Sequence, residues 1–321
     1  MTDYKLSVII PVFNAAQHIE RCCRSLFGQT LDNIQYIFVN DGSNDNSIEL
    51  ICREADMFPE RKDSIIIIDR HENKGVAFTR QQGLEFAQGE YIIHCDADDW
   101  VEPNMYELLY QTGKKENADV VCCGYMIENG NNKRAVLPQI PYNVDFKISP
   151  IFGSLCSRAS RKTIFDLNGI KFSPDINWGE DFLVSAKCQV LANKVAVVNK
   201  PLYHYIQHST SITHTITHEK CLNLLKCGVE MEKFLREKGL FEKYEFELNF
   251  LKFQLKQFFL IFPEVYSPSL WKQNFVECHK DILHYNTSFY LKISAWLVAH
   301  HLTPLARIIL QLRILLNRIR H

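Results

Sequence analysis

Three carboxylates, Asp96, Asp98 and Asp99, stand within four residues at the end of a short apolar run, Tyr91–Cys95. The run has the composition of a strand, and carboxylates clustered at a strand end favour a hard divalent cation. Mg²⁺ and Mn²⁺ take oxygen ligands and are often held by one or two carboxylates together with substrate phosphates. The alternative is an acidic turn before a helix, because Pro103 follows at a position suited to a helix start. The three residues alone do not separate these interpretations.

The elements that must position this cluster alternate between strand-like and helix-like patterns. The predicted strands are Leu6–Phe13, Ile34–Val39, Ser64–Asp69, Glu90–Cys95 and Asp119–Met126. Helix patterns begin near Asn14, Asp45, Gly75 and Asn104. Since the Ser64–Asp69 run is almost entirely isoleucine, we expect it to be buried on both faces. The regular alternation predicts βαβ units, and therefore an α/β fold with a mostly parallel sheet between layers of helices.

Polar residues stand at four predicted strand ends, namely Asn14, Asp41, Asp69 and the Asp96–Asp99 cluster. Ligands of such sheets bind beyond the carboxyl ends of the strands. The pattern therefore predicts a site for a nucleotide, its phosphates and a metal. Neither G-x-G-x-x-G nor G-x-x-x-x-G-K-[ST] occurs, so a metal rather than a glycine-rich helix start is expected to neutralise the phosphates. That arrangement suits a nucleoside diphosphate that departs as a leaving group.

The composition is that of a globular protein with room for two domains: 321 residues, 46% hydrophobic and 23% charged. A formal net charge of -1 gives no indication of a nucleic-acid partner. The eleven cysteines lack C-x-x-C spacing, which predicts reduced, mostly buried thiols in a cytosolic protein. The N-terminus leads directly into the first predicted strand, so no signal peptide is expected. No apolar run approaches the roughly 18 residues that span a bilayer.

Four segments, in order, resemble the motifs of family 2 glycosyltransferases of the GT-A fold. They are Ser7–Asn14 (SVIIPVFN), Val39–Ser43 (VNDGS), Glu72–Gly75 (ENKG) and Asp96–Asp99 (DADD). The resemblance is strong over about residues 5–125 and weaker to about residue 213. It implies an inverting, nucleotide-sugar-dependent enzyme with a nucleotide-sugar-binding core (1–125), an acceptor-binding part (126–215) and a C-terminal helical region (216–321).

The resemblance also implies which residues hold the nucleoside. Pro11 and Val12 would touch it through backbone groups, and Asn14 closes the same motif. Asp41 would accept a hydrogen bond from the base, most often from N3–H of uracil. Asp69 would lie against the base or the ribose where the third strand ends.

By the same resemblance, the acidic cluster would hold the rest of a UDP-sugar donor. Asp96 would lie by the ribose, with Ala97 between it and Asp98. Asp98 would ligate Mn²⁺ or Mg²⁺, and Asp99 would support or share the metal.

The resemblance also implies that residues elsewhere in the chain lie near the diphosphate. Arg80 matches an arginine that lies near the donor sugar and diphosphate, with a surface ion pair as the alternative. Gln81 stands where the family has asparagine, which puts that local contact in doubt. The stretch Tyr203–Ser211 resembles a loop that folds over the diphosphate. Its His208 or Ser211 could contact phosphate, and His208 could instead be a third metal ligand or purely structural.

The candidate catalytic residues are Glu180 and Asp181, which follow Trp178. Transfer with inversion needs a base that takes the proton of the acceptor hydroxyl. A partly desolvated carboxylate beside an aromatic side chain suits this task, and the pair matches the family's Glu-Asp motif. The resemblance implies Asp181 as the base and Glu180 as a neighbour that orients the acceptor. A capping pair at a helix start is the structural alternative.

The middle segment has two parts. Residues 126–150 are rich in Asn and then Pro, which predicts an excursion out of the sheet. Ser154–Phe172 resembles a segment of bacterial members that decorate capsule, O-antigen or lipooligosaccharide glycans.

The C-terminal third is expected to be helical over Leu222–Leu235, Tyr244–Phe262 and the residues after Ser288. Residues 302–321 contain arginines and no acid, and Ile308, Leu312, Leu315, Leu316 and Ile319 form one stripe. This is the pattern of an interfacial helix on an anionic membrane. A helix packed on its own domain and a homodimer contact are the alternatives.

These patterns together predict a metal-dependent transferase of hexose or N-acetylhexosamine from a UDP-sugar to a glycan or lipid-linked acceptor. We expect a cytoplasmic protein, peripheral at the inner face of the membrane. A sugar nucleotidyltransferase is disfavoured because Pro11–Ala16 lacks a glycine-rich, basic loop. A donor-binding scaffold without activity is disfavoured by the presence of Asp98 and Asp181.

Overall fold

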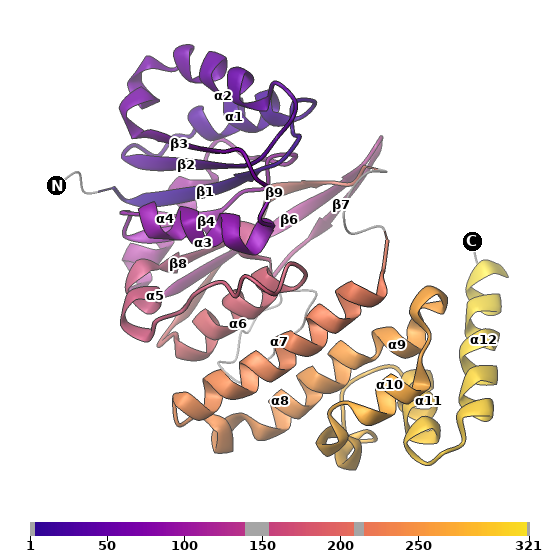
Figure 1. Cartoon of the computed structure of the whole chain (residues 1–321). Helices are drawn as coiled ribbons and strands as arrows, with labels where there is room; N and C mark the ends of the chain where they lie inside the picture. Colours follow the sequence, from indigo (N-terminus) through magenta and orange to yellow (C-terminus); the bar gives the residue numbers. More distant parts are fainter. Residues whose placement is uncertain (1–3, 139–153, 209–214, 320–321) are drawn as a thin grey trace. The chain divides into compact units, whose positions relative to one another are not determined.

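A computed structural model describes residues 4–138, 154–208 and 215–319 (Figure 1). The described residues form two compact units. The first contains residues 4–138 and 154–208, and the second contains residues 215–319.

The described part of the first unit is built on one nine-stranded sheet. Its strands are β1 (Leu6–Val12), β2 (Ile34–Asp41), β3 (Ile65–Arg70), β4 (Tyr91–His94), β5 (Trp100–Val101), β6 (Val120–Asn129), β7 (Asn132–Val136), β8 (Arg158–Arg161) and β9 (Val195–Ile206). The order is β3-β2-β1-β4-β8-β6-β9-β5, with β7 paired to β6. Strands β3, β2, β1 and β4 are parallel, as are β6 and β9, whereas β8, β5 and β7 pair antiparallel. The predicted α/β fold with a mostly parallel sheet is confirmed.

Helices cover both faces of this sheet. They are α1 (Ile19–Phe27), α2 (Ser47–Asp56), α3 (Val76–Phe86), α4 (Met105–Glu116), α5 (Lys162–Asn168) and α6 (Glu180–Leu191), with 3₁₀ turns η1 (Pro59–Ser64) and η3 (Leu155–Ser157). Alternate residues of β1, such as Val8 and Ile10, join a core with α1, α2 and α4. Ile9 points to the other face, where α3 approaches so closely that a Cβ at Gly83 would lie 2.3 Å from its Cγ2. Figure 1 shows α1 and α2 on one side of β1–β3 and α3 on the other.

Three sequence predictions about the first unit are wrong. β3 is an edge strand whose isoleucines are half-buried, because it pairs only with β2 and a composition pattern does not distinguish edge from centre. Residues 126–136 do not leave the sheet, since they continue β6 and return as β7. Tyr203 and His204 belong to strand β9 rather than to a loop. Residues 139–153 and 209–214, which include residues 139–150 of the proposed excursion and Ser211, lie outside the described residues.

The second unit is helical, as predicted. It contains α7 (His218–Glu237), α8 (Phe241–Lys256), α9 (Phe258–Ile261), α10 (Pro268–Gln273), α11 (Phe289–Ala299) and α12 (Thr303–Ile319), with 3₁₀ turns η5 (Pro263–Val265) and η6 (Val276–Asp281). Its core contains Phe253, Phe259 and Trp271, all fully buried. Within the described ranges, no helix combines the length and apolar character needed to cross a bilayer.

The cysteines are mostly buried, as expected from the sequence. Ten of the eleven are buried and Cys52 is exposed.

Candidate active site

The four parallel strands β3, β2, β1 and β4 bring their carboxyl ends to one edge of the sheet. This edge carries the Pro11–Asn14 segment, Asp41, Asp69 and the Asp96–Asp99 cluster, which are separate in sequence. The predicted strand-end residues are therefore gathered in one region.

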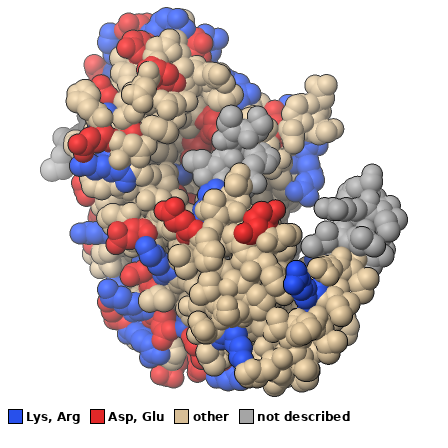
Figure 2. All heavy atoms as spheres, turned by 45° about the vertical axis from the view of Figure 1, so that its right-hand side comes forward, with Lys and Arg blue, Asp and Glu red and all other residues tan. Residues whose placement is uncertain are grey.

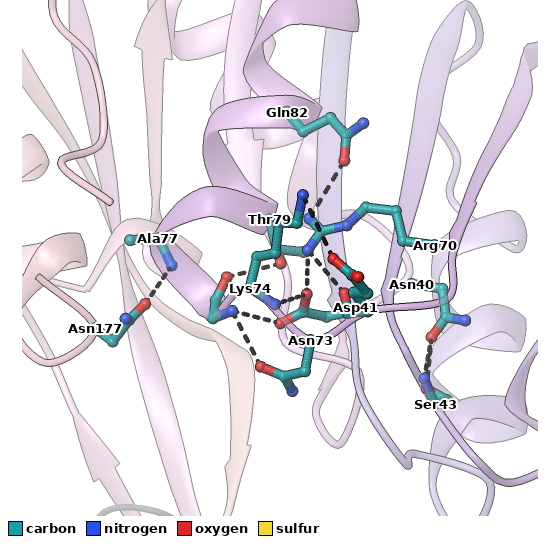
Figure 3. Close-up of polar contacts among 12 residues, drawn as sticks. Asn40, Asp41, Ser43, Arg70, Asn73, Lys74, Ala77, Thr79, Gln82 and Asn177 are labelled. Carbon is teal, nitrogen blue, oxygen red and sulfur yellow. Dashed lines mark hydrogen bonds and ion pairs between the residues drawn. The ribbon is translucent and has the colours of Figure 1, made fainter. Parts of the chain in front are cut away.

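Asp41 is the centre of the hydrogen bonding at the end of β2 (Figure 3). Its buried carboxylate accepts from Arg70 Nη2 at 2.5 Å, from Lys74 N at 2.8 Å and from Gly75 N at 2.9 Å. A carboxylate has about four acceptor positions, so about one remains for a ligand. Nothing in the local sequence around Arg70 indicates that it is the partner of Asp41, so Arg70 is not among the predicted site residues.

Asn14 and Asp69 also join the loops at this edge. Asn14 does not cap α1, whose N-cap is His18. Its Oδ1 accepts from Asn44 N at 2.9 Å, and its own backbone N donates to Ser43 Oγ at 3.0 Å. Asp69 is exposed, and its Oδ1 accepts from Asn40 Nδ2 at 2.7 Å. These contacts hold the loops after β1, β2 and β3 together.

The start of α3 is held by a residue 100 positions later in the chain. Gly75 has φ 88°, which favours glycine, and a Cβ there would lie 2.4 Å from Asn177 Oδ1. The same Oδ1 accepts from Ala77 N at 3.2 Å (Figure 3). Asn177 thus connects the loop before Glu180 to the start of α3.

Arg80 lies between the two groups of carboxylates that the sequence singled out. Its Nη2 donates to Asp96 Oδ1 at 2.8 Å, and its Nε lies 3.4 Å from Glu180 Oε1. The surface ion pair considered for Arg80 is excluded, because the residue is 4% exposed. Within the described residues, its buried Nη1 has no hydrogen-bond partner. Gln81, next to it, accepts from Phe172 N at 3.0 Å and so serves packing rather than the site.

Asp98 and His208 are brought together although 110 residues separate them. His208 Nε2 lies 2.9 Å from Asp98 Oδ2, and its ring stacks on His18 at 4.9 Å between centroids. Arg21 Nη2 donates to the Asp98 carbonyl at 3.1 Å. Burial and the charge of Asp96 raise the pKa of Asp98, while the His208 hydrogen bond opposes this shift. His18 and Arg21 are not among the predicted site residues, because they lie far from Asp98 along the chain and no local pattern indicates the contact.

Asp99 differs in environment from Asp98. Its carboxylate is 1% exposed and accepts from Tyr203 Oη and from Ile206 N. Burial, together with the charges of Asp98 and Asp96, raises its pKa well above the usual range. The expectation that Asp99 supports or shares a metal stays a prediction. Through its contacts with Tyr203 and Ile206, Asp99 also fastens the acidic loop to strand β9.

Asp96 and Asp98 fit a hard cation that is held jointly with a substrate. Among the described residues, no three His, Cys, Asp or Glu side chains are arranged to hold a metal by themselves. Mg²⁺ and related ions are commonly bound through one or two carboxylates plus phosphate and water oxygens. Asp98, with a side chain 33% exposed, and Asp96, with a side chain 38% exposed, supply such oxygens.

Glu180 and Asp181 open helix α6, where the helix dipole favours negative charge. Glu180 is buried, and burial together with the Asp181 charge raises its pKa to about 7. Asp181 is half-buried, and its Oδ1 accepts from Phe182 N at 2.6 Å. Burial also raises the pKa of Asp181, against the opposing charge of Arg80. A half-buried carboxylate with a raised pKa can take a proton from a substrate hydroxyl.

The family model described as "Glycosyl transferase family 2" matches residues 7–171, which contain all four strand ends of this edge. The chain belongs to glycosyltransferase family 2. It is therefore a glycosyltransferase, and the family resemblance seen in the sequence is confirmed.

Two curated relatives of this family 2 enzyme are cholesterol galactosyltransferase of Borreliella burgdorferi and putative glycosyltransferase EpsH of Bacillus subtilis. The first is 30% identical over 286 residues, covering 82% of this chain and 76% of the relative. The second is 29% identical over 256 residues, covering 76% and 73%.

Solved structures share the fold. TarS 1–349 of S. aureus in complex with UDP-GlcNAc has a TM-score of 0.72 at 16% identity, covering 96% of this chain and 90% of that one. The mannosyltransferase PcManGT of Pyrobaculum calidifontis, in complex with GDP-Man and Mn²⁺, has a TM-score of 0.53 at 15% identity, covering 98% and 87%.

The other predicted donor residues of this glycosyltransferase lie at the same edge. Pro11 is half-buried and Val12 fully buried at the end of β1, where only backbone groups are suited to meet a ligand. Ala97 is buried between Asp96 and Asp98. Trp178 is half-buried two residues before Glu180.

Proposed function

We propose that the chain is an inverting, metal-dependent glycosyltransferase that moves a hexose or N-acetylhexosamine from a UDP-sugar. The observation that carries the proposal is Arg80, a buried cation that contacts Asp96 of the strand-end cluster and lies 3.4 Å from Glu180 at the start of α6. Through Arg80, the Asp96 cluster, which is suited to a donor, lies close to the Glu180–Asp181 pair, which is suited to proton transfer.

The donor would lie along the carboxyl edge of β1–β4, within the 1–125 core. Backbone groups of Pro11 and Val12, with the loop that Asn14 holds, would receive the nucleoside. The remaining acceptor position of Asp41 would take N3–H of uracil. Asp69 and Asp96 would lie by the ribose, and Arg80 would lie near the donor sugar and the diphosphate. TarS structures contain UDP or UDP-GlcNAc, which supports a uridine donor.

Asp98, supported by His208, would hold Mn²⁺ or Mg²⁺ together with the diphosphate. A cation bound there would stabilise the negative charge of the leaving diphosphate. Asp99 would keep the loop that carries Asp98 in place through β9. The complex of PcManGT with GDP-Man and Mn²⁺ supports a metal in a protein of this fold.

Asp181 would act as the base and Glu180 as its neighbour that orients the acceptor. As Asp181 takes the proton of the acceptor hydroxyl, that oxygen attacks the anomeric carbon from the side opposite the diphosphate. The new glycosidic bond forms while the bond to the diphosphate breaks, so the anomeric configuration inverts. Asp181 is favoured over Glu180 as the base because it is half-buried rather than buried.

The acceptor would be a glycan or a lipid-linked sugar in the synthesis of cell-surface polysaccharide, bound by residues 126–215. The relatives include an enzyme named for cholesterol and another named poly(ribitol-phosphate) beta-glucosyltransferase. We place the protein in the cytoplasm, peripheral at the inner face of the membrane through residues 302–321.

The proposal is tested by thermal shift with a panel of nucleotide sugars, with and without Mn²⁺, because a ligand that binds the native state raises the melting temperature. Stabilisation by one UDP-sugar only in the presence of metal is expected. Incubation with that donor and a lipid-linked or oligosaccharide acceptor, followed by NMR of the product linkage, should show the inverted anomer. Retention of configuration, or metal-independent transfer, would refute the mechanism. A response confined to guanosine, cytidine or thymidine nucleotides would refute the role of Asp41.

A further inference from the structure

Helix α12 of the second unit has two apolar faces, and described residues cover only one of them. Ala306 and Leu310 are buried in the core of this unit. Leu305, Ile308 and Leu312 are 50%, 52% and 55% exposed. Their spacing places these three side chains along a single stripe. We call them the α12 stripe.

The charged residues of the segment that carries this stripe have one sign. Residues 282–321 contain no Asp or Glu, but they contain Lys292, Arg307, Arg313, Arg318 and Arg320. Arg307 is exposed within α12, and Arg313 lies over the Tyr290 ring at 3.4 Å. At the lower right of Figure 2, the surface of this unit is tan with blue and without red. The stripe is apolar, and all the Asp, Glu, Lys and Arg residues of its segment are cations. This combination indicates a partner surface that has both apolar and anionic groups.

We propose that the α12 stripe docks on the surface of a membrane containing anionic phospholipid. An interfacial helix of this kind buries its apolar residues among the acyl chains just below the headgroups, while its arginines meet lipid phosphates. The helix would lie in the plane of the membrane. The inference rests on the membrane location proposed above for residues 302–321 and deepens it. Its evidence comes from the second unit alone, so it does not depend on the identity of the sugar donor.

A second copy of the chain is a less suitable occupant. In a two-fold symmetric contact the same patch meets itself, so Arg307 and its neighbours would face like charges. Between residues 282 and 321 there is no acid to compensate them. Anionic headgroups supply the missing negative charge in any register.

The test uses the full chain and vesicles of phosphatidylcholine, with or without phosphatidylglycerol. Deletion of residues 302–321 is unsuitable, because it would remove Ala306 and Leu310 from the core. The variant is Leu305→Ser, Ile308→Ser and Leu312→Ser together. Because all three side chains are exposed, its melting temperature should stay close to that of the wild type.

We expect wild-type protein to co-sediment with the phosphatidylglycerol vesicles, less so as salt is raised. The triple variant should lose about tenfold or more in partitioning. The matched control is Leu222→Ser with Val229→Ser, two exposed apolar residues of α7, and it should bind like the wild type.

Two single-charge variants measure the electrostatic part of membrane binding. Arg307→Ala should weaken binding roughly fivefold, since one cation near an anionic surface contributes about that much. Lys233→Ala, an exposed cation of α7, should leave it unchanged. Equal binding by the triple variant and its control would overturn the proposal. So would a dimer in sedimentation velocity that the triple variant loses, or failure of the wild type to bind anionic vesicles.

Discussion

Replacing Glu180 by glutamine should stabilise the protein, and more so as the pH rises. Glu180 is buried with a pKa of about 7, against 4.5 for an exposed glutamate. The folded chain therefore binds this proton more tightly than the unfolded chain. The stabilisation that comes from this tighter proton binding is fully present below pH 4.5 and is lost as the pH rises through 7. Glutamine resembles the protonated side chain at every pH.

The size of the effect follows from the two pKa values. Each unit between them corresponds to about 1.4 kcal/mol, so the ionised carboxylate costs about 3 kcal/mol above pH 7. Near pH 5 the cost is below about 1 kcal/mol, because the native side chain is already protonated. For a unit of this size, about 3 kcal/mol corresponds to a rise in melting temperature of roughly 6–12 °C.

The assay is thermal unfolding of wild type and Glu180→Gln at pH 5 and pH 8.5, without ligand. Glu49→Gln, on the exposed face of α2, is the matched control for the loss of one carboxylate. The Glu180→Gln variant is expected to gain stability over the wild type mainly at pH 8.5. If Glu180→Gln were instead less stable at pH 8.5, attraction to Arg80 would outweigh burial, and the assignment of a raised pKa would be wrong.

The other predictions concern donor binding, catalysis and the loop scaffold. Asp181→Asn should retain donor binding, measured by thermal shift, and lose about 10²–10⁴ in the rate of transfer; a loss under tenfold would contradict its role as base. Asp98→Asn should abolish the metal dependence of donor binding in the same assay, so unchanged dependence would remove Asp98 from the metal site. Arg70→Met leaves the buried Asp41 without its cation and should reduce the free energy of unfolding by about 3–5 kcal/mol in urea titration. The matched surface variant Arg53→Met should change it by less than about 1 kcal/mol.

The sequence was sufficient to predict strands β1 to β4, the start of β6 and the helices between them, because local patterns determine these elements. Strand starts at residues 6, 34 and 120 lie within one residue of their predicted positions. Parallel strands then place their carboxyl ends together by geometry alone, so Asp41 and Asp98 were identifiable as residues of one sheet edge.

What the sequence could not supply are contacts that depend on long-range pairing. The insertion of β8 between β4 and β6 leaves no local periodicity. Asp98 and Asp99 are adjacent and chemically alike, yet only Asp99 meets Tyr203 and the backbone of β9. That difference follows from the position of a strand more than 100 residues later. The contacts of Arg70 and His18 were not predicted for the same reason.

The balance of charge at the edge of the sheet favours binding of the donor together with its metal. Arg80 is a buried cation that contacts Asp96 and Glu180, and its charge also acts on Asp181. A diphosphate arriving alone would add negative charge where burial and neighbouring charges already raise the pKa of Asp98. Repulsion of this kind is strong at low dielectric. We therefore expect the donor to bind with its divalent cation, so that metal dependence appears in donor affinity and not only in turnover.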